Sequence, residues 1–262
     1  ANGSVEELRR DESGAQPEHV LFRSGLFHRL GFRLKRRGGH RHRRKRGHDA
    51  LGREGCDQFG ADALRFTLSA MAAQGRDIKL STQRVEGYRN FATKLWNATR
   101  FAGMNGCKRA EGFDPHQVKL ALNRWAMGEL ARAIQEVTQA IEAYRFNDAA
   151  NAAYRFVWNI VCDWYLELSK DTFASGGAEA EKSKRVLGHV LDQLLRLMHP
   201  TMPFLSEALW TSLTGGESLV IAAWPTSSKN FASDTEALSV VSKLQRLITE
   251  IRRFRSEQGI KT

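Results

Sequence analysis

The sequence has few cysteines and no long apolar run, and these shortages exclude several classes of protein. Its cysteines, Cys56, Cys107 and Cys162, form no CxxC pair and no Cys/His ligand spacing, which favours a reduced, intracellular protein. No apolar stretch approaches the roughly 20 residues that a bilayer span needs, and the first 28 residues lack the basic start and apolar centre of a secretion signal. We therefore expect a cytoplasmic protein that does not bind membranes.

Sequence signatures of nucleotide and metal sites are also missing. The chain contains no G-x-x-x-x-G-K-[ST], no G-x-G-x-x-G and no H-E-x-x-H. His40, His42 and His48 could hold a metal, but solvated side chains are favoured in this stretch. Cys162 and Asp163 are consecutive, and consecutive helical residues point about 100° apart, so they cannot act as a catalytic pair. No catalytic, cofactor-binding or metal-ligating residue is predicted.

Positive charge is concentrated in one short stretch near the start of the chain. The net charge is +11, but residues 29–48 hold eight Arg and two Lys and no acid, and residues 1–28 carry −2. Residues 49–262 therefore contribute only +3. A basic balance ordinarily suggests a nucleic-acid ligand, but here the charge belongs to this stretch and says little about the rest of the chain.

Residues 1–58 form a basic tail that we expect to have little stable structure. They contain no Trp or Tyr and show no helical or strand period, so they cannot bury enough apolar surface to offset the entropy of ordering. A basic arm for RNA is one interpretation. A solvated or non-native tail is favoured over it, because charge runs alone have low specificity.

From Phe59 onward, apolar residues recur at helical spacing, which predicts an all-α helical bundle. Asp62 is expected to cap the first helix and Asp234 the last, because Asp is a favoured N-cap. Asp114-Pro115 is expected to start the third. A short extended segment is expected near residues 218–224. The predicted helices cover residues 63–74, 83–104, 115–144, 146–170, 178–198, 203–213 and 235–258.

The predicted helix Phe146–Lys170 forms the centre of this bundle. Its polar residues recur every fourth position and so form one narrow stripe, while apolar residues cover most of the remaining circumference. A helix of this kind has neighbours on several sides. Arg155, Asn159 and Asp163 of the stripe are expected to form a buried hydrogen-bonded network with a structural role rather than a binding site.

The predicted helix at residues 83–104 has an outer face rich in cations and amides, with Tyr88, Trp96 and Phe101 close by. Single-stranded RNA binding uses cations for phosphates and aromatic planes for unstacked bases. A solvated face above an aromatic core has the same pattern, and the residues alone favour it because most helices look this way. The polar residues of the face are Arg84, Arg89, Asn90, Lys94, Asn97 and Arg100.

Several stretches, in chain order, carry a more specific pattern: FGADALRFTLSAMAAQGRDIKLS (59–81), RVEGYRNFATKLWNATRF (84–101), FNDAANAAYRFVWNIVCDWYLELSK (146–170), MHPTMPFLSEALW (198–210) and EIRRFRSEQG (250–259). Together they closely resemble the bacterial valyl-tRNA synthetase family and cover nearly all of residues 59–262. Isoleucyl and leucyl enzymes share the bundle, but the AQGRDIKLS loop and the CDWYLE run look valyl.

The resemblance implies a class I anticodon-binding domain, a helical bundle that follows a Rossmann-fold catalytic domain. In the full-length enzyme, ATP with Mg²⁺ activates valine, which then passes to the 3′ end of tRNA(Val). This region would hold the anticodon stem-loop. The residues then expected to face RNA are Arg84, Arg89, Asn90, Lys94, Asn97, Arg100 and Phe101, with Arg89, Lys94 and Arg100 on phosphates or base edges and Phe101 stacking.

The chain departs from the family pattern before Phe59. In that family the G-A-D-A-L-R-F segment lies just after a K-M-S-K-S loop, but Arg36–Asp49 reads RRGGHRHRRKRGHD. The H-I-G-H signature and the editing domain are absent too. We therefore expect a fragment with no catalytic site or cofactor of its own, preceded by an out-of-frame or foreign segment at residues 1–58.

The expected organisation is a basic tail at residues 1–58, an anticodon-binding bundle at 59–228 and a C-terminal helix at 229–262 that leads to a truncated tRNA-binding arm. We expect a monomer that binds tRNA but neither DNA nor membranes. Two alternatives stay open. One is a helical interaction scaffold without an RNA role, and the other is the equivalent domain of an isoleucyl enzyme.

Overall fold

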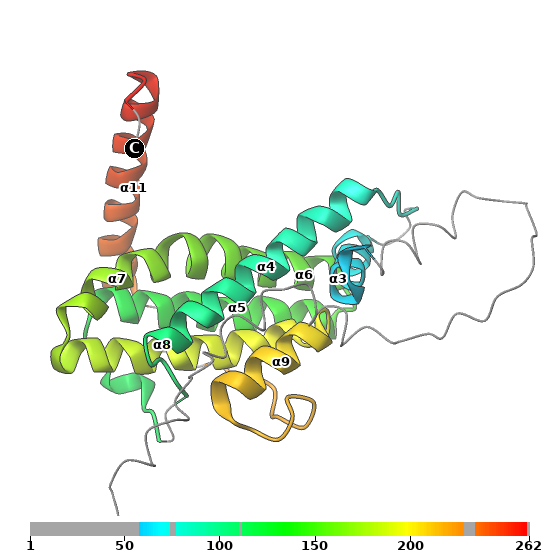
Figure 1. Cartoon of the computed structure of the whole chain (residues 1–262), viewed down its shortest axis with the longest axis horizontal. Coiled ribbons are helices and arrows are strands. Elements are labelled where there is room, and N and C mark those ends of the chain that lie inside the picture. Colours follow the sequence, from blue (N-terminus) through cyan, green and yellow to red (C-terminus); the bar gives the residue numbers. More distant parts are fainter. Residues whose placement is uncertain (1–57, 74–76, 110–111, 228–233, 261–262) are drawn as a thin grey trace, which may run out of the picture. The chain divides into compact units, whose positions relative to one another are not determined.

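The computed structural model describes residues 58–73, 77–109, 112–227 and 234–260. Every regular element in these ranges is helical, which confirms the all-α prediction (Figure 1). The predictions for the basic tail fall, apart from Gln58, outside the described residues. The elements are α3 (Ala61–Met71), α4 (Thr82–Met104), η2 (Pro115–Gln117), α5 (Ala121–Glu142), α6 (Phe146–Arg155), η3 (Phe156–Tyr165), α7 (Leu166–Ser175), α8 (Gly177–Met198), α9 (Pro203–Thr214) and α11 (Thr235–Glu257).

The predicted cap of the first helix is wrong. Asp62 lies inside the first turn of α3, whose N-cap is Gly60. The Asp62 carboxylate instead accepts hydrogen bonds from the backbone N–H groups of Phe204 (3.3 Å) and Leu205 (2.6 Å) at the start of α9. The N-cap residue of α9 makes no side-chain bond of its own, so Asp62 supplies acceptors for N–H groups that have no partner within the helix.

The start of the third predicted helix is also corrected. Asp114 and Pro115 begin only the short 3-10 turn η2, in which the Asp114 carboxylate accepts from the N–H of His116 at 2.9 Å. The backbone at Val118 is extended, and α5 begins only at Ala121. A capping Asp followed by Pro favours a first helical turn, but nothing in that pattern makes the helix continue.

The central helix is continuous from Phe146 to Ser175, through α6, η3 and α7. Phe156, Val157 and Tyr165 are buried in it, as the apolar pattern predicts. Its middle, η3, is a π-helix rather than the expected α-helix. A π-helix closes each turn with i→i+5 bonds, is rare in proteins and occurs frequently at functional sites.

The later elements agree with the sequence in part. Asp234 caps α11 as predicted, because its carboxylate accepts from the N–H of Ala237 at 3.0 Å. α9 ends where Gly215 takes a left-handed φ of 68°, a conformation that suits glycine. Residues 218–224, for which an extended segment was expected, contain a turn and no strand.

The core joins apolar side chains of α4, α5, α8, α9 and the central helix. α4 runs obliquely across the other helices (Figure 1) and packs against η3, α8 and α9. A chain of polar groups crosses this core: the Tyr165 hydroxyl donates to Asn123 Oδ1 at 2.9 Å, and Asn123 Nδ2 donates to Ser183 Oγ at 2.8 Å. Because these side chains are buried, each needs its partner.

Candidate nucleic-acid interface

α4 turns one side toward the core and the opposite side away from it. Val85, Phe91 and Leu95 are buried, and Ser81 fixes the first turn by accepting from the N–H of Arg84 at 3.4 Å. Most of the polar residues predicted to face RNA lie on the outer side and are exposed: Arg89, Asn90, Asn97 and Arg100. Arg84 is exposed too, but it lies in the first turn, on the side of the helix that carries the buried Phe91 and Leu95 seven and eleven residues later. Their contact with RNA stays a prediction.

Lys94 lies at the edge of this outer face and is half-buried. Its ammonium is 2.5 Å from Asp163 Oδ1 and 3.8 Å from the centre of the Trp158 ring. Both partners belong to η3. Lys94 is therefore paired in the structure, and its charge is opposed by a neighbouring carboxylate.

Phe101, the residue expected to stack on a base, is half-buried and packs against the core. Its ring centre lies 6.4 Å from that of Phe173, and the Lys170 ammonium lies 5.9 Å from the Phe101 ring centre. Part of the ring therefore rests on α7. Any stacking by Phe101 would use the part that remains at the surface.

Aromatic rings fill the junction between α3, α4 and the central helix. The ring centres of Phe66 and Phe91 are 5.2 Å apart, and those of Phe91 and Tyr154 are 4.7 Å apart. Tyr88 and Tyr154 meet edge to face at 6.0 Å. Burial raises the pKa of both tyrosines, so this cluster is neutral and holds α4 against α3 and α6 by packing.

The predicted polar network along the central helix does not form. Arg155 and Asn159 are exposed, and the Arg155 guanidinium pairs with Glu136 of α5 at 2.9 Å. Asp163 pairs with Lys94 of α4. The two charges therefore pair with different helices, Arg155 with α5 and Asp163 with α4. They do not meet in one network because this side of the central helix is at least partly exposed.

The structure adds cations beside the central helix that the sequence did not predict, one of them near the outer face of α4. Lys170 on α7 approaches Phe101, and the Arg252 guanidinium of α11 lies 5.5 Å from the centre of the Trp164 ring of η3. These contacts join segments far apart in the chain, so no local spacing indicates them. The only available signal was the set of aromatic residues in the central helix, which indicates partners but does not identify them.

The two described thiols, Cys107 and Cys162, are buried. Burial raises the pKa of Cys107 to about 11 and that of Cys162 to about 12, so both are protonated at neutral pH. Within the described ranges, no three His, Cys, Asp or Glu side chains lie close enough to hold a metal ion. His40, His42 and His48 lie outside those ranges. None of the described helices is long and apolar enough to cross a membrane.

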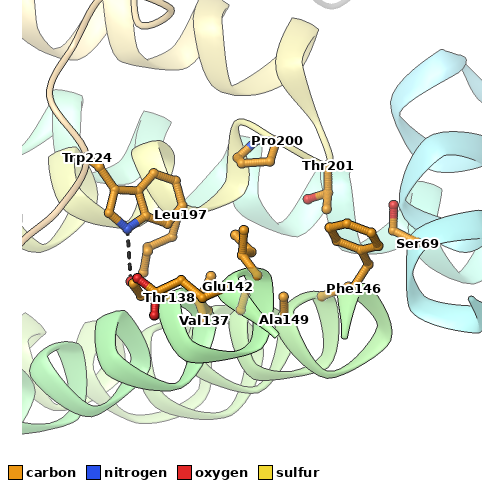
Figure 2. A pocket seen from close by; sticks show the side chains of 13 residues that line it. Ser69, Val137, Thr138, Glu142, Phe146, Ala149, Leu197, Pro200, Thr201 and Trp224 are labelled. Atoms are coloured by element: carbon orange, nitrogen blue, oxygen red, sulfur yellow. Dashed lines mark hydrogen bonds between the residues drawn. The ribbon is translucent and has the colours of Figure 1, made fainter. Parts of the chain in front are cut away.

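A pocket of about 430 Å³ lies beside the α5–α6 hairpin, as Figure 2 shows. Phe146, Leu197 and Trp224 contribute to its largely apolar lining, and Trp224 Nε1 donates to Thr138 Oγ1 at 2.9 Å. Glu142 is the one charged side chain in this lining. The pocket therefore lacks the cations that a phosphate requires, and α4 remains the better candidate for nucleic acid.

Comparisons with known proteins agree on one family. A family model described as the anticodon-binding domain of tRNA ligase matches residues 123–262. The chain is 58% identical to a valine–tRNA ligase of Rhodopseudomonas palustris over 181 aligned residues. The alignment covers 69% of the chain and 19% of that relative. It is also 52% identical to a valine–tRNA ligase of Rhizobium meliloti over 211 aligned residues, and this alignment covers 78% of the chain and 22% of that relative.

A solved structure shows the same arrangement of helices. It is a ternary complex of the LeuRS of Agrobacterium radiobacter K84 with tRNA and LeuAMS, and it matches with a TM-score of 0.55 and 25% identity. The match covers 71% of the chain and 23% of that protein. The chain spans about a fifth of the length of the curated relatives it matches.

Proposed function

Because the chain belongs to the family of the anticodon-binding domain of tRNA ligases, we propose that it binds the anticodon stem-loop of a valine-accepting tRNA. The valyl resemblance predicted from the sequence is confirmed by the relatives, which are valine–tRNA ligases. Their names also favour valine over the isoleucyl alternative.

The exposed face of α4 supports this proposal most directly. It presents the cations Arg89 and Arg100 beside the amides of Asn90 and Asn97, and Arg84 is exposed at the start of the helix. Guanidinium groups suit phosphates and base edges, and amides suit the edges of unstacked bases. We assign Arg89 and Arg100 to phosphates or base edges on this ground.

Phe101 and Lys94 complete the proposed interface. The surface part of the Phe101 ring would stack on a loop base, which typically contributes about 1–3 kcal/mol. Lys94 would contact a phosphate or a base edge. Both lie at the edge of the exposed face and near the central helix, Lys94 beside η3 and Phe101 beside α7, so RNA bound there would contact α4 and the central helix together.

For the longer protein of which this chain would be a portion, we propose the activity of a valine–tRNA ligase. ATP with Mg²⁺ would activate valine in a catalytic domain outside this chain, and the bundle would keep the correct tRNA in register. The chain itself is proposed to have no catalytic role or cofactor. A monomer in the cytoplasm is consistent with this proposal.

We propose the domain organisation expected from the sequence. Residues 59–228 form the anticodon-binding bundle, and residues 229–262 lead into a further tRNA-binding arm. Arg124 supports a firm junction between the two, because its guanidinium lies 2.7 Å from Asp234 and 3.0 Å from Glu236 at the start of α11. Two statements about residues 1–58 stay predictions: that they have little stable structure and that they are read out of frame. Translating the encoding DNA in its other frames tests the out-of-frame origin.

The test is a binding comparison between two stem-loops that differ only in the anticodon. Attraction through basic segments acts equally on both RNAs, so a difference in affinity reports recognition. We expect the valine anticodon to bind more tightly than an isoleucine anticodon, at two salt concentrations. Equal affinity for the two would favour the scaffold alternative, and a preference for the isoleucine anticodon would favour the isoleucyl one.

Single substitutions then locate the site. Arg100→Ala should weaken binding and make the dependence of log K on log salt less steep by about 0.7, the value expected for one lost phosphate contact on a single strand. Arg145→Ala is the matched control, because Arg145 is an exposed arginine at the α5–α6 connection, outside α4. An unchanged affinity and slope for Arg100→Ala would remove Arg100 from the interface.

A further inference from the structure

One face of the Trp158 ring is covered by the Lys94 ammonium. Lys94 Nζ lies 3.8 Å from the ring centre, and Asp163 Oδ1 holds it there at 2.5 Å. The contact is close to the surface, since the Lys94 and Asp163 side chains are 29% and 44% exposed. A base that stacked on this face would have to take the place of the ammonium.

The ring beneath is held in a fixed orientation. Trp158 is nearly parallel to Tyr154, at 11° and 5.7 Å between centres, and lies at 27° and 6.3 Å from Phe91. A packed aromatic ring of this kind loses little entropy when a base stacks on it. It also belongs to the π-helical segment η3, a type of helix frequent at functional sites.

The amides of the proposed RNA face adjoin this ring. Asn90 and Asn97 precede and follow Lys94 by four and three residues on α4, so all three lie on one side of the helix. RNA bound to these amides would therefore pass close to the Lys94–Asp163 pair.

The charges at this position oppose RNA binding in the state observed. Lys94 is paired with a carboxylate, so together they present no net positive charge to a phosphate. A partly exposed ion pair is weak and is readily exchanged. A phosphate is a competing acceptor that also makes a charge-assisted bond with the ammonium.

On the premise that α4 binds RNA as proposed above, we infer that Trp158, Lys94 and Asp163 form a covered subsite for one unpaired nucleotide. The phosphate of that nucleotide takes the Lys94 ammonium from Asp163, and its base stacks on the face of Trp158 that Lys94 leaves. Asp163 thus holds the subsite closed and lowers the affinity of the chain for RNA.

Asp163→Asn is the decisive variant, tested in the full chain with an anticodon stem-loop carrying a valine anticodon. We expect affinity at low salt to increase by up to about fivefold, the equivalent of one partly exposed ion pair. The salt slope should steepen by about 0.7, because Lys94 then contacts a phosphate without leaving a carboxylate behind. Lys94→Met should cancel the increase in the Asp163→Asn chain.

Asp148→Asn is the matched control. It removes the same charge from an exposed aspartate of the central helix, but Asp148 pairs with Arg145 at the start of α6 and not with Lys94. A general change in net charge would move both variants equally. The inference requires the effect of Asp163→Asn to exceed that of Asp148→Asn.

A fluorescent base gives a second readout that does not depend on affinity. 2-Aminopurine placed in turn at each loop position should be quenched on binding at one position, more strongly in the Asp163→Asn chain, and Trp158→Leu should remove that quenching. Thermal unfolding of each variant verifies that it folds.

The outcomes separate this inference from the proposed function. Failure of every variant to bind the stem-loop would overturn both. Binding with an unchanged or weakened affinity in Asp163→Asn, relative to Asp148→Asn, would overturn the covered subsite alone. Tighter binding with a steeper slope that Lys94→Met cancels, and quenching that requires Trp158, would support it.

Discussion

Gly188→Ala should destabilise the chain, although alanine is the better helix former. Gly188 is buried in α8, where the backbone of the loop after α4 crosses it. A Cβ added at Gly188 would lie 2.6 Å from the carbonyl carbon of Lys108 and closer still to its oxygen. Real Cβ atoms do not approach a backbone so closely, so either α8 or the loop must move.

Two opposing effects decide the magnitude. Replacing glycine by alanine inside a helix gains about 1 kcal/mol, whereas overpacking a well-filled interior typically costs about 1–3 kcal/mol. The neighbour is backbone rather than the end of a flexible side chain, so the cost should lie at the upper end of this range. We expect a net loss of about 1–2 kcal/mol, equivalent to a decrease in Tm of about 2–8 °C for a domain of this size.

Gly87→Ala provides the control, because Gly87 is an exposed position of α4 with no atom near the added Cβ. Thermal unfolding followed by circular dichroism should show a higher Tm for Gly87→Ala, by about 2–4 °C, and a lower Tm for Gly188→Ala. A Gly188→Ala chain as stable as the natural one would contradict the close packing of α8 against the loop after α4.

Further predictions concern buried polar groups. Tyr165→Phe removes the donor to Asn123 and should cost about 1–3 kcal/mol in urea unfolding; no loss would mean that Asn123 finds another donor. The buried Asp192 carboxylate accepts from Trp210 Nε1 at 2.6 Å and pairs with Arg196 at 3.1 Å. Asp192→Asn removes its charge and should destabilise the chain by about 3 kcal/mol; an unchanged stability would show that these contacts do not hold α8 and α9 together. Burial lowers the pKa of His189 below its ordinary 6.5, so its contribution to stability is complete above that pH and is lost as pH falls toward the folded value. His189→Gln should make the free energy of unfolding depend less steeply on pH below 6.5. An unchanged dependence would show that His189 does not cause it.

The helices could be predicted from the sequence because their apolar spacing is local. The partners of capping residues could not be predicted in the same way. Asp234 and Asp62 both precede apolar helical patterns, but only one of them caps the helix that follows it. Asp234 caps its own helix as predicted. Asp62 caps α9, which lies 142 residues away in sequence, because tertiary contacts gave it a better set of unpaired N–H groups. The two residues cannot be distinguished by local pattern.

The candidate site could be predicted only as a helix face. Arg89, Asn97 and Arg100 are exposed, as the period of 3.6 requires. Lys94 was predicted to lie on the same face, and the structure pairs it with Asp163, 69 residues away. The π-helical geometry of η3 was not predictable either, because an apolar run with polar residues every fourth position is equally compatible with an α-helix.

Crosslinking from the RNA identifies the helices that the anticodon loop contacts. An anticodon stem-loop with 4-thiouridine in its loop is bound to the full chain, irradiated and digested, and the attached peptides are identified. We expect crosslinks to peptides of α4 between Arg84 and Phe101, and to those of η3. Crosslinks confined to the basic stretch at residues 29–48 would show that charge alone attracts the RNA, and would rule out an RNA interface on α4 and η3.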